Sequence, residues 1–258
     1  MRDPKVSVIT VTYNSSKVLE RTIKSVVLQK YNNVEYLIID GQSQDETVEI
    51  AKKYKPFLST IISEPDKGVY DAMNKGMLLA SGEWVIFMNA GDVFCNDEVL
   101  KNIFSLEIDK KTAVLYGDTI YSYPFGRYRA PGLKNNERIF CHQSTFFKLD
   151  VLKKFPYDLK YKIASDQNSY RKILENGWSE QYVPVDVAEY EAFSGLSSLR
   201  IVERYKEMCE IKHRKKDIHF YKGLMDVFLK QIRMNFEPES IYLKRKRKEV
   251  HSRFDCLD

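Results

Sequence analysis

The chain has 258 residues, of which 43% are hydrophobic and 30% are charged, so one sizeable domain with a full apolar core can form. No window approaches the roughly 18 consecutive apolar residues of a transmembrane helix, and the N-terminus lacks the apolar region of a signal peptide. The four cysteines are scattered without a CxxC pair, which argues against a zinc knuckle and a secreted disulfide framework. We therefore expect a cytoplasmic protein with reduced thiols.

The net charge of +5 is unevenly distributed. Residues 200–258 contain 16 lysines and arginines against 10 aspartates and glutamates, a surplus of 6, whereas residues 1–199 contain 25 against 26. We therefore expect two parts: a front domain at residues 1–199 and a basic, helical C-terminal region at residues 200–258.

The first third of the chain alternates between strands and helices. Residues 6–12 form a β-branched, apolar run that predicts a buried strand, and Ser15 or Ser16 is placed to cap the helix after it. The pattern continues with strands at 36–40, 58–63 and 83–88, a helix that starts at Asp45, and a helix at 69–80. This alternation predicts parallel βαβ units in a doubly wound, mostly parallel α/β sheet.

Beyond residue 92 the alternation loosens. The sequence predicts a strand at 113–121, an ordered loop at 123–133, a strand at 144–147, and helices near 150–154 and 165–176.

Polar residues follow three of the predicted strands. They are the segments 12–14, 40–41 and 89–92, with sequences TYN, DG and NAGD. In doubly wound sheets, ligands bind beyond the carboxyl ends of the strands. We therefore expect a binding site where these three segments converge.

Two carboxylates stand at these strand ends. Asp92 could hold a hard divalent cation that neutralises a diphosphate, or it could simply cap the helix that opens at Asp97 and Glu98. Asp40, followed by Gly41, could accept a hydrogen bond from a nucleobase or ribose, or it could only form a turn.

Three further residues are candidates for chemistry. Asp71 lies in the first turn of a predicted helix, where it could contact a donor or act only as an N-terminal charge. His142 could bind a metal or a phosphate oxygen as a neutral imidazole, or it could be structural. Asp166 could deprotonate an acceptor hydroxyl as a general base, or Ser165 or Asp166 could be an N-cap.

Taken together, these segments resemble family 2 glycosyltransferases with the GT-A fold, over roughly residues 4–200. The likeness rests on VSVITVTYN at 6–14, IDGQSQDET at 39–47, EPDKGVYDAMNKG at 64–76, and the segment 80–92. The segments CHQSTFF at 141–147 and IASDQ at 163–167 are similar to counterparts in bacterial enzymes that make colanic acid, capsule and O-antigen.

This resemblance implies a metal-dependent, inverting transfer of a sugar from a nucleotide-sugar, with UDP as the default nucleotide. The acceptor would be a glycan or a lipid-linked sugar in bacterial surface polysaccharide synthesis. Asp166 would be the catalytic base, Asp92 and His142 would hold Mn²⁺ or Mg²⁺, and residues 193–197 would form a loop over the donor. The expected nucleotide-binding residues are Val11, Tyr13, Asp40, Asp71 and Asn89.

The sequence departs from the family pattern at two points, and the first of them supports an alternative. The usual Asp-x-Asp metal motif is NAGD at 89–92, with one carboxylate, and the usual Asp-Asp after the second strand is Asp40-Gly41. The alternative is a non-catalytic nucleotide-sugar-binding or scaffold protein. A nucleotidyltransferase or a Rossmann dehydrogenase would need a glycine-rich phosphate loop, which residues 13–17 lack.

The basic run at residues 244–248 has aromatic residues in the same region. It could meet the anionic headgroups of a membrane, bind nucleic acid, or form a solvated helix face. We expect the membrane surface and no nucleic acid, because a lipid-linked acceptor would lie there. The location expected is therefore cytoplasmic, with peripheral association at the inner face of the plasma membrane.

Overall fold

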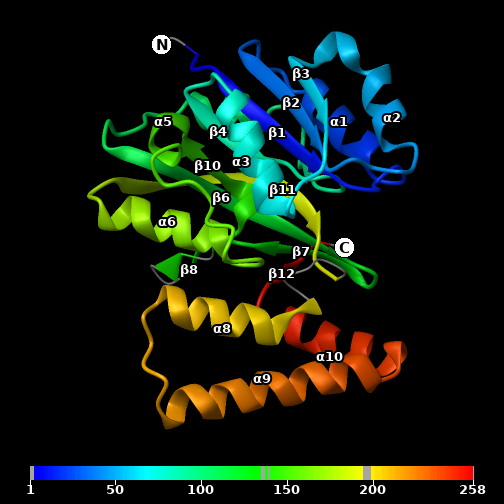
Figure 1. Ribbon diagram of the computed structural model, residues 1–258, viewed down its shortest axis with the longest axis vertical. Coiled ribbons are helices and arrows are strands. Elements are labelled where there is room, and N and C mark those ends of the chain that lie inside the picture. Colours follow the sequence, from blue (N-terminus) through cyan, green and yellow to red (C-terminus); the bar gives the residue numbers. More distant parts are fainter. Residues whose placement is uncertain (1–2, 135–136, 139, 194–198, 258) are drawn as a thin grey trace.

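The computed structural model describes residues 3–134, 137–138, 140–193 and 199–257. Within these residues, ten strands form one sheet whose main path is β12-β7-β6-β10-β4-β1-β2-β3 (Figure 1). The first part of the chain supplies alternating strands and helices, as the sequence predicts. They are β1 (Val6–Thr12), α1 (Leu19–Val27), β2 (Val34–Asp40), α2 (Thr47–Lys53), β3 (Thr60–Ser63), α3 (Val69–Leu79) and β4 (Trp84–Phe87).

The sheet is mostly parallel. β1 pairs in parallel with both β2 and β4, and β2 pairs in parallel with β3. β10 (Thr145–Lys148) lies antiparallel between β4 and β6 (Thr112–Tyr123), so β6 again runs in the direction of β4. β11 (Ser179–Glu191) is parallel to β6. The predicted doubly wound α/β architecture is confirmed, with β10 as an antiparallel insertion.

Helices cover both faces of this sheet, and each face has its own hydrophobic core. On one face α1 and α4 (Val99–Phe104) bury residues such as Ile23 and Ile103. On the other face α3 and α6 (Ser165–Glu175) bury residues such as Met77 and Ile173. Each such burial contributes about 1.5–3 kcal/mol, so both layers hold the strands and fix where they end.

Two segments differ from the prediction. The segment expected as a loop contains β7 (Gly126–Ala130), which forms a hairpin with β6 because Tyr128 alternates inward with outward-facing arginines. α1 begins at Leu19 without a side-chain cap, since the Ser15 hydroxyl donates to the Tyr13 carbonyl instead. The expected Ser15 or Ser16 cap is therefore wrong.

Three helices near the C-terminus form a layer at one end of the molecule (Figure 1). They are α8 (Ile201–Ile211), α9 (Ile218–Phe236) and α10 (Glu239–His251). The chain then returns to the sheet, where β12 (Asp255–Cys256) pairs with β7. Residues 200–258 are thus helical as predicted and also supply a strand to the main sheet, while a domain boundary at residue 199 stays a prediction.

Several short elements complete the description. They are β5 (Val93–Phe94), the 3-10 turn His142–Ser144, α5 (Leu149–Leu152) and the two-stranded pair β8 (Leu133–Lys134) and β9 (Glu137–Arg138). All four cysteines are free. In the part of the chain that the structure describes, no helix is both long and apolar enough to span a bilayer.

Candidate active site

Four residues predicted to bind a nucleotide gather where the central parallel strands end. Asp40 is the last residue of β2 and is paired in register with the end of β1. After β4, the Ala90 N–H donates to the Val11 carbonyl at 3.1 Å, which fixes the segment that begins with Asn89 against β1. Tyr13, just beyond β1, is 62% exposed. The structure therefore brings Val11, Tyr13, Asp40 and Asn89 to one edge, as expected for this kind of sheet.

The carboxylate of Asp40 is largely used within the protein. One oxygen accepts from the Ser43 hydroxyl, and the other accepts from the Ser43 N–H at 2.9 Å and the Ser63 hydroxyl at 2.6 Å. Asp40 is only 2% exposed. These are the contacts of a turn-forming aspartate, and a contact with a nucleotide stays a prediction.

A second carboxylate at this edge, Asp66, was missed by the sequence analysis. A Cβ atom added to Gly41 would lie 2.5 Å from Asp66 Oδ2 and 3.4 Å from the Tyr13 ring. Asp66 and Tyr13 therefore both lie against Gly41, and a side chain at position 41 would displace the Asp66 carboxylate. The sequence could have indicated Asp66, because this residue comes shortly after the end of β3, much as Asp40 stands at the end of β2.

Asp71 lies in the first turn of α3. Its carboxylate accepts from the Lys67 N–H at 3.0 Å and lies 3.7 Å from the Lys75 ammonium group. The side chain thus organises the start of the helix, in line with the N-terminal-charge alternative. Its neighbour Tyr70, by contrast, points into the site, so the α3 start still borders it.

Asp92, the last residue of the NAGD segment, is buried and does not cap a helix. α4 begins at Val99, its N-cap residue is Glu98, and the cap makes no side-chain hydrogen bond, so the capping alternative is wrong. Asp92 is 8% exposed, and burial raises its pKa to about 7, although Gln143 and the charge of Arg21 act in the opposite direction. A buried carboxylate of this kind is stabilised by a nearby cation.

The side-chain oxygen atoms of Asn89 and Asp92 fit a hard divalent cation. Asn89 Oδ1 is a buried oxygen that accepts no hydrogen bond from any described residue, and Asp92 supplies a carboxylate three residues away. Oxygen donors are the ligands that Mg²⁺ and Mn²⁺ prefer, and Mg²⁺ commonly combines one or two carboxylates with substrate phosphates. Among the described residues there is no group of three or more His, Cys, Asp or Glu side chains arranged for a metal.

Asp166 lies in the first turn of α6 and is held by α3. The hydroxyl of Tyr70 lies 2.9 Å from Asp166 Oδ1 and 2.8 Å from the Ile163 carbonyl, so its proton is shared between the two oxygens. The N-cap of α6 is Ala164 and makes no side-chain hydrogen bond, which rules out the expected alternative of Ser165 or Asp166 as the cap. Asp166 is 8% exposed and positioned by a partner that lies 96 residues away in sequence.

His142 lies beside Asp166. Its Nδ1 atom is 3.9 Å from Asp166 Oδ2, and its ring stacks on Phe87 at a centroid distance of 5.4 Å. Burial lowers the pKa of His142, while the charge of Asp166 opposes that shift. Neither ring nitrogen makes a hydrogen bond to a described residue. A buried neutral imidazole with both nitrogens unused is poised to meet a ligand.

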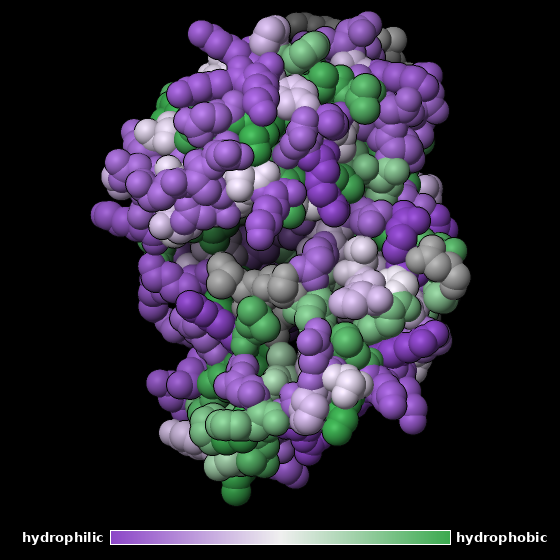
Figure 2. Space-filling model, turned by 90° about the vertical axis from the view of Figure 1, so that its right-hand side faces the viewer, coloured by the Kyte–Doolittle hydropathy of each residue, from purple (hydrophilic) through white to green (hydrophobic). Residues whose placement is uncertain are grey.

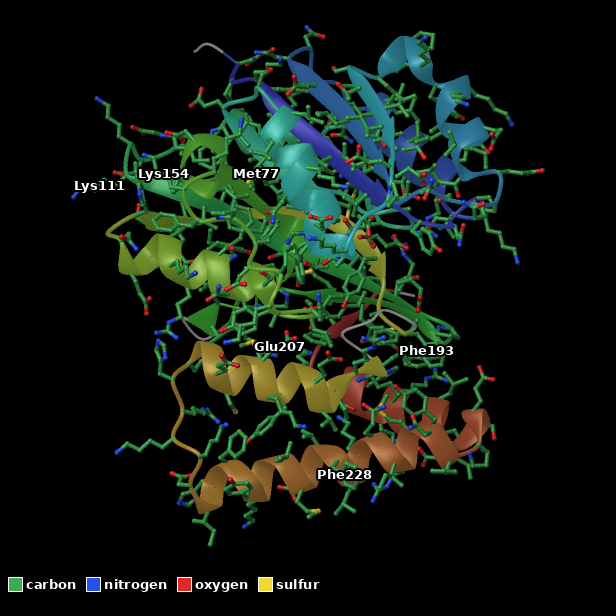
Figure 3. The ribbon with its side chains drawn as sticks, viewed as in Figure 1. Met77, Lys111, Lys154, Phe193, Glu207 and Phe228 are labelled. Atoms are coloured by element: carbon green, nitrogen blue, oxygen red, sulfur yellow. The ribbon has the colours of Figure 1, made fainter. Side chains whose placement is uncertain are left out.

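A glutamate from the C-terminal region holds the segment that leads into Asp166. Glu207 lies on α8 (Figure 3). Its carboxylate accepts from three successive backbone N–H groups. They belong to Lys162 at 2.7 Å, Ile163 at 3.0 Å and Ala164 at 2.9 Å. Glu207 is 9% exposed. The sequence carried no signal for this contact, because Glu207 resembles any other charged residue of a surface helix.

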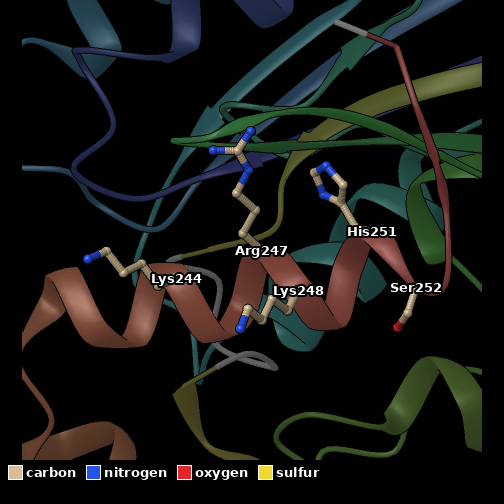
Figure 4. A pocket seen from close by; sticks show the side chains of 5 residues that line it. All are labelled: Lys244, Arg247, Lys248, His251 and Ser252. Atoms are coloured by element: carbon tan, nitrogen blue, oxygen red, sulfur yellow. The ribbon is translucent and has the colours of Figure 1, made fainter.

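The basic run of the C-terminal region lies on α10, and its side chains fall into two groups. Arg245 and Lys246 pair with Glu237 and Glu249. The others, with two residues of the last turn, line an open hollow of about 630 Å³ (Figure 4). These lining residues are Lys244, Arg247, Lys248, His251 and Ser252.

The predicted donor-covering loop at residues 193–197 lies outside the described residues except for Phe193. The Phe193 ring packs 5.6 Å from the ring of Tyr242 on α10. The C-terminal helices thus reach the beginning of that segment.

The family is shown by sequence comparison. The model of glycosyl transferase family 2 matches residues 7–171. The chain belongs to glycosyl transferase family 2. A PGL/p-HBAD biosynthesis glycosyltransferase from Mycobacterium bovis is 31% identical over 225 residues, which cover 83% of this chain and 87% of the relative. An uncharacterized glycosyltransferase from Mycobacterium tuberculosis is 34% identical over 181 residues, which cover 64% of this chain and 66% of that protein.

Solved structures of other glycosyltransferases share the fold of this family 2 enzyme. Residues 1–349 of S. aureus TarS in complex with UDP superpose with a TM-score of 0.67 at 21% identity, covering 90% of this chain and 72% of that chain. The mannosyltransferase PcManGT from Pyrobaculum calidifontis, in complex with GDP-Man and Mn²⁺, gives a TM-score of 0.67 at 18% identity and covers 87% and 69%. The expected GT-A fold is thereby confirmed.

Proposed function

We propose that this family 2 glycosyltransferase transfers a sugar, with inversion, from a nucleoside-diphosphate sugar to a hydroxyl group of a glycan or lipid-linked acceptor. The observation that carries the proposal is the carboxylate of Asp166, held by Tyr70 beside a neutral His142 near the end of the parallel strands. A positioned carboxylate within reach of a hydroxyl is what general-base catalysis requires.

In the proposed reaction, the acceptor oxygen attacks the anomeric carbon as the bond to the nucleoside diphosphate breaks. Asp166 accepts the proton of the acceptor hydroxyl, and the Tyr70 hydroxyl keeps the carboxylate oriented. Because burial keeps His142 neutral, the imidazole does not neutralise Asp166 in an ion pair.

We propose that Asp92, with the Asn89 oxygen, holds Mn²⁺ or Mg²⁺, and that His142 lies close enough to the donor to bind the metal or a phosphate oxygen. When bound, the metal would stabilise the negative charge of the leaving diphosphate. Asp92 and Asn89 both have side-chain oxygen atoms that suit a hard cation.

For the donor, we propose a nucleotide bound at the edge that contains Val11, Tyr13 and Asp40, with UDP as the default and Asp66 as a further contact. Two neighbours of similar fold are in complex with UDP and with GDP-Man, so both nucleotides need testing. We propose synthesis of a bacterial surface polysaccharide as the role, with an acceptor at the cytoplasmic side of the membrane.

The first test compares the Asp166→Asn variant with an Asp150→Asn control, whose carboxylate is exposed on α5. Asp166→Asn should lower transfer by about 10²–10⁴-fold while nucleotide binding survives, since the amide cannot accept the proton. Near wild-type transfer by Asp166→Asn would contradict the assignment.

The second test measures thermal stabilisation by UDP, GDP, CMP and dTDP, each with and without Mn²⁺. A shift with one nucleotide that grows with metal identifies the base of the donor. A non-catalytic nucleotide-sugar-binding protein is the second candidate, favoured by the lack of a three-residue metal cluster among the described residues. Binding without any donor hydrolysis or transfer in the presence of Mn²⁺ would favour that alternative.

A further inference from the structure

Helix α9 exposes an unusual amount of apolar surface for a helix on the outside of a protein. It is 19 residues long, and none of its residues is buried. In the space-filling view, hydrophobic atoms gather at the end of the molecule formed by this helix (Figures 1 and 2). The large side chains at least 39% exposed are Ile218, Tyr221, Met225, Phe228, Leu229, Ile232 and Phe236.

These seven side chains form one continuous stripe. At about 100° per residue, they fall within an arc of about 100° that runs the full length of the helix. The opposite side of α9 packs on α8, where Phe220 lies 6.0 Å from the ring of Tyr205 and Gln231 accepts from the Ile201 N–H. The stripe therefore faces away from the rest of the protein, and no described residue covers it.

The stripe has a basic border. On the same geometry, Lys222 and Arg233 lie just beyond its edge at Leu229, next to Asp226, which is the only acidic residue within α9. Neither cation pairs with a carboxylate of a described residue, in contrast to Arg245 on α10, which pairs with Glu237. An apolar stripe with unpaired cations along its edge is the arrangement of a helix that lies in a membrane interface.

We propose that the α9 stripe and its basic border dock this enzyme on an anionic lipid bilayer, with the helix lying in the plane of the membrane. The apolar side chains would enter the boundary between headgroups and acyl chains, and the cations would meet lipid phosphates. This deepens the proposed function, since it gives the enzyme a way to reach a lipid-linked acceptor. The proposal places the contact with the membrane on α9, whereas the sequence alone led us to expect it at the basic run of residues 244–248.

Charge favours a bilayer over a second copy of the chain as the occupant. An isologous dimer through the stripe would bring Lys222 and Arg233 of both copies to one interface, four cations with only two copies of Asp226 to balance them. Like charges at a desolvated interface are unfavourable. Anionic lipid, by contrast, complements both the apolar stripe and its border.

The test is cosedimentation of the full chain, without donor, with vesicles of phosphatidylcholine and with vesicles of phosphatidylcholine and phosphatidylglycerol in equal parts. Phe228→Ser removes a central side chain of the stripe, and Phe57→Ser, at a 58% exposed phenylalanine far from α9, is the matched control. The charge reversal Lys222→Glu with Arg233→Glu is matched by Lys52→Glu with Lys53→Glu on α2, where both lysines are also exposed. Circular dichroism checks that every variant is folded.

We expect the wild type to bind the anionic vesicles and to bind the neutral ones more weakly. Phe228→Ser should lower the partition coefficient about tenfold, as expected for losing one inserted aromatic side chain, and Phe57→Ser should leave it unchanged. The α9 charge reversal should abolish the preference for anionic lipid, whereas its control on α2 should keep it.

Four outcomes would overturn the proposal, three of them in the vesicle experiment and its controls. These three are absence of vesicle binding, vesicle binding that Phe228→Ser does not weaken, and a concentration-dependent dimer that Phe228→Ser dissociates in the absence of any lipid binding. Equally tight, salt-dependent binding to single-stranded RNA would also overturn it. Because nucleotide binding is measured separately, failure of the membrane surface is distinguishable from failure of the proposed transferase function.

Discussion

The buried carboxyl group of Asp92 makes the stability of the metal-free protein depend on pH. Its pKa is raised from 3.8 to about 7 in the folded state, so the folded protein binds this proton more tightly than the unfolded chain does. Stability from this group is therefore greatest below about pH 4, decreases as pH rises to about 7, and then levels off. A difference of about three pKa units corresponds to a loss of about 4 kcal/mol at high pH.

Replacement of Asp92 by asparagine removes the titrating group while keeping its shape. In EDTA at about pH 8, Asp92→Asn should unfold at a higher temperature than the wild type, by as much as roughly 10 °C. At about pH 4 the two proteins should be nearly equal in stability, because both side chains are then neutral. Thermal or urea unfolding, followed by circular dichroism at several pH values, measures both differences.

Manganese provides the second half of this experiment. Added Mn²⁺ should stabilise the wild type in the presence of the preferred nucleoside diphosphate and should have little effect on Asp92→Asn, because the amide is a weak metal ligand. Asp150→Asn, at an exposed position, should behave like the wild type throughout. The reasoning fails if metal-free Asp92→Asn is less stable than the wild type at about pH 8, or if its stability keeps the wild-type pH dependence.

Two other contacts give further predictions. Glu207→Gln should lower the free energy of unfolding by about 2 kcal/mol, since a carboxamide replaces the charged acceptor of three backbone N–H groups. Transfer should also fall, whereas Glu203→Gln on the exposed side of the same helix should change neither quantity. Tyr70→Phe should lower transfer by about tenfold, because the Asp166 carboxylate loses the hydroxyl that orients it. Nucleotide binding should stay unchanged, and transfer at the wild-type rate would count against a positioning role of Tyr70.

Local sequence patterns were sufficient to predict the parallel part of the fold. A strand buried on both faces is a continuous apolar run, and a helix between two strands has its own periodicity, so residues 6–88 could be assigned from neighbours alone. Parallel strands must then end at a common edge, which is why Val11, Asp40 and Asn89 were correctly expected together. The hairpin of β6 and β7 was missed because a segment rich in Tyr, Arg, Pro and Gly was read as a loop.

What the carboxylates do was decided by tertiary packing. Whether Asp40 faces a ligand or the hydroxyls of Ser43 and Ser63 depends on side-chain directions that no local pattern encodes. Asp166 meets Tyr70 and His142 only because α3, α6 and the turn before β10 pack together. These partners come from distant parts of the chain, so their contacts depend on how whole elements pack.

In the C-terminal helices, too, some features followed from the sequence alone and others depended on the tertiary structure. The sequence alone determined that residues 200–258 are basic and helical, because composition and periodicity are local properties. Only the tertiary structure decided that Glu207 faces inward to the segment before Asp166 and that the apolar stripe of α9 faces outward. The reason is that a helix has several sides, and which side is covered depends on the element that packs against it.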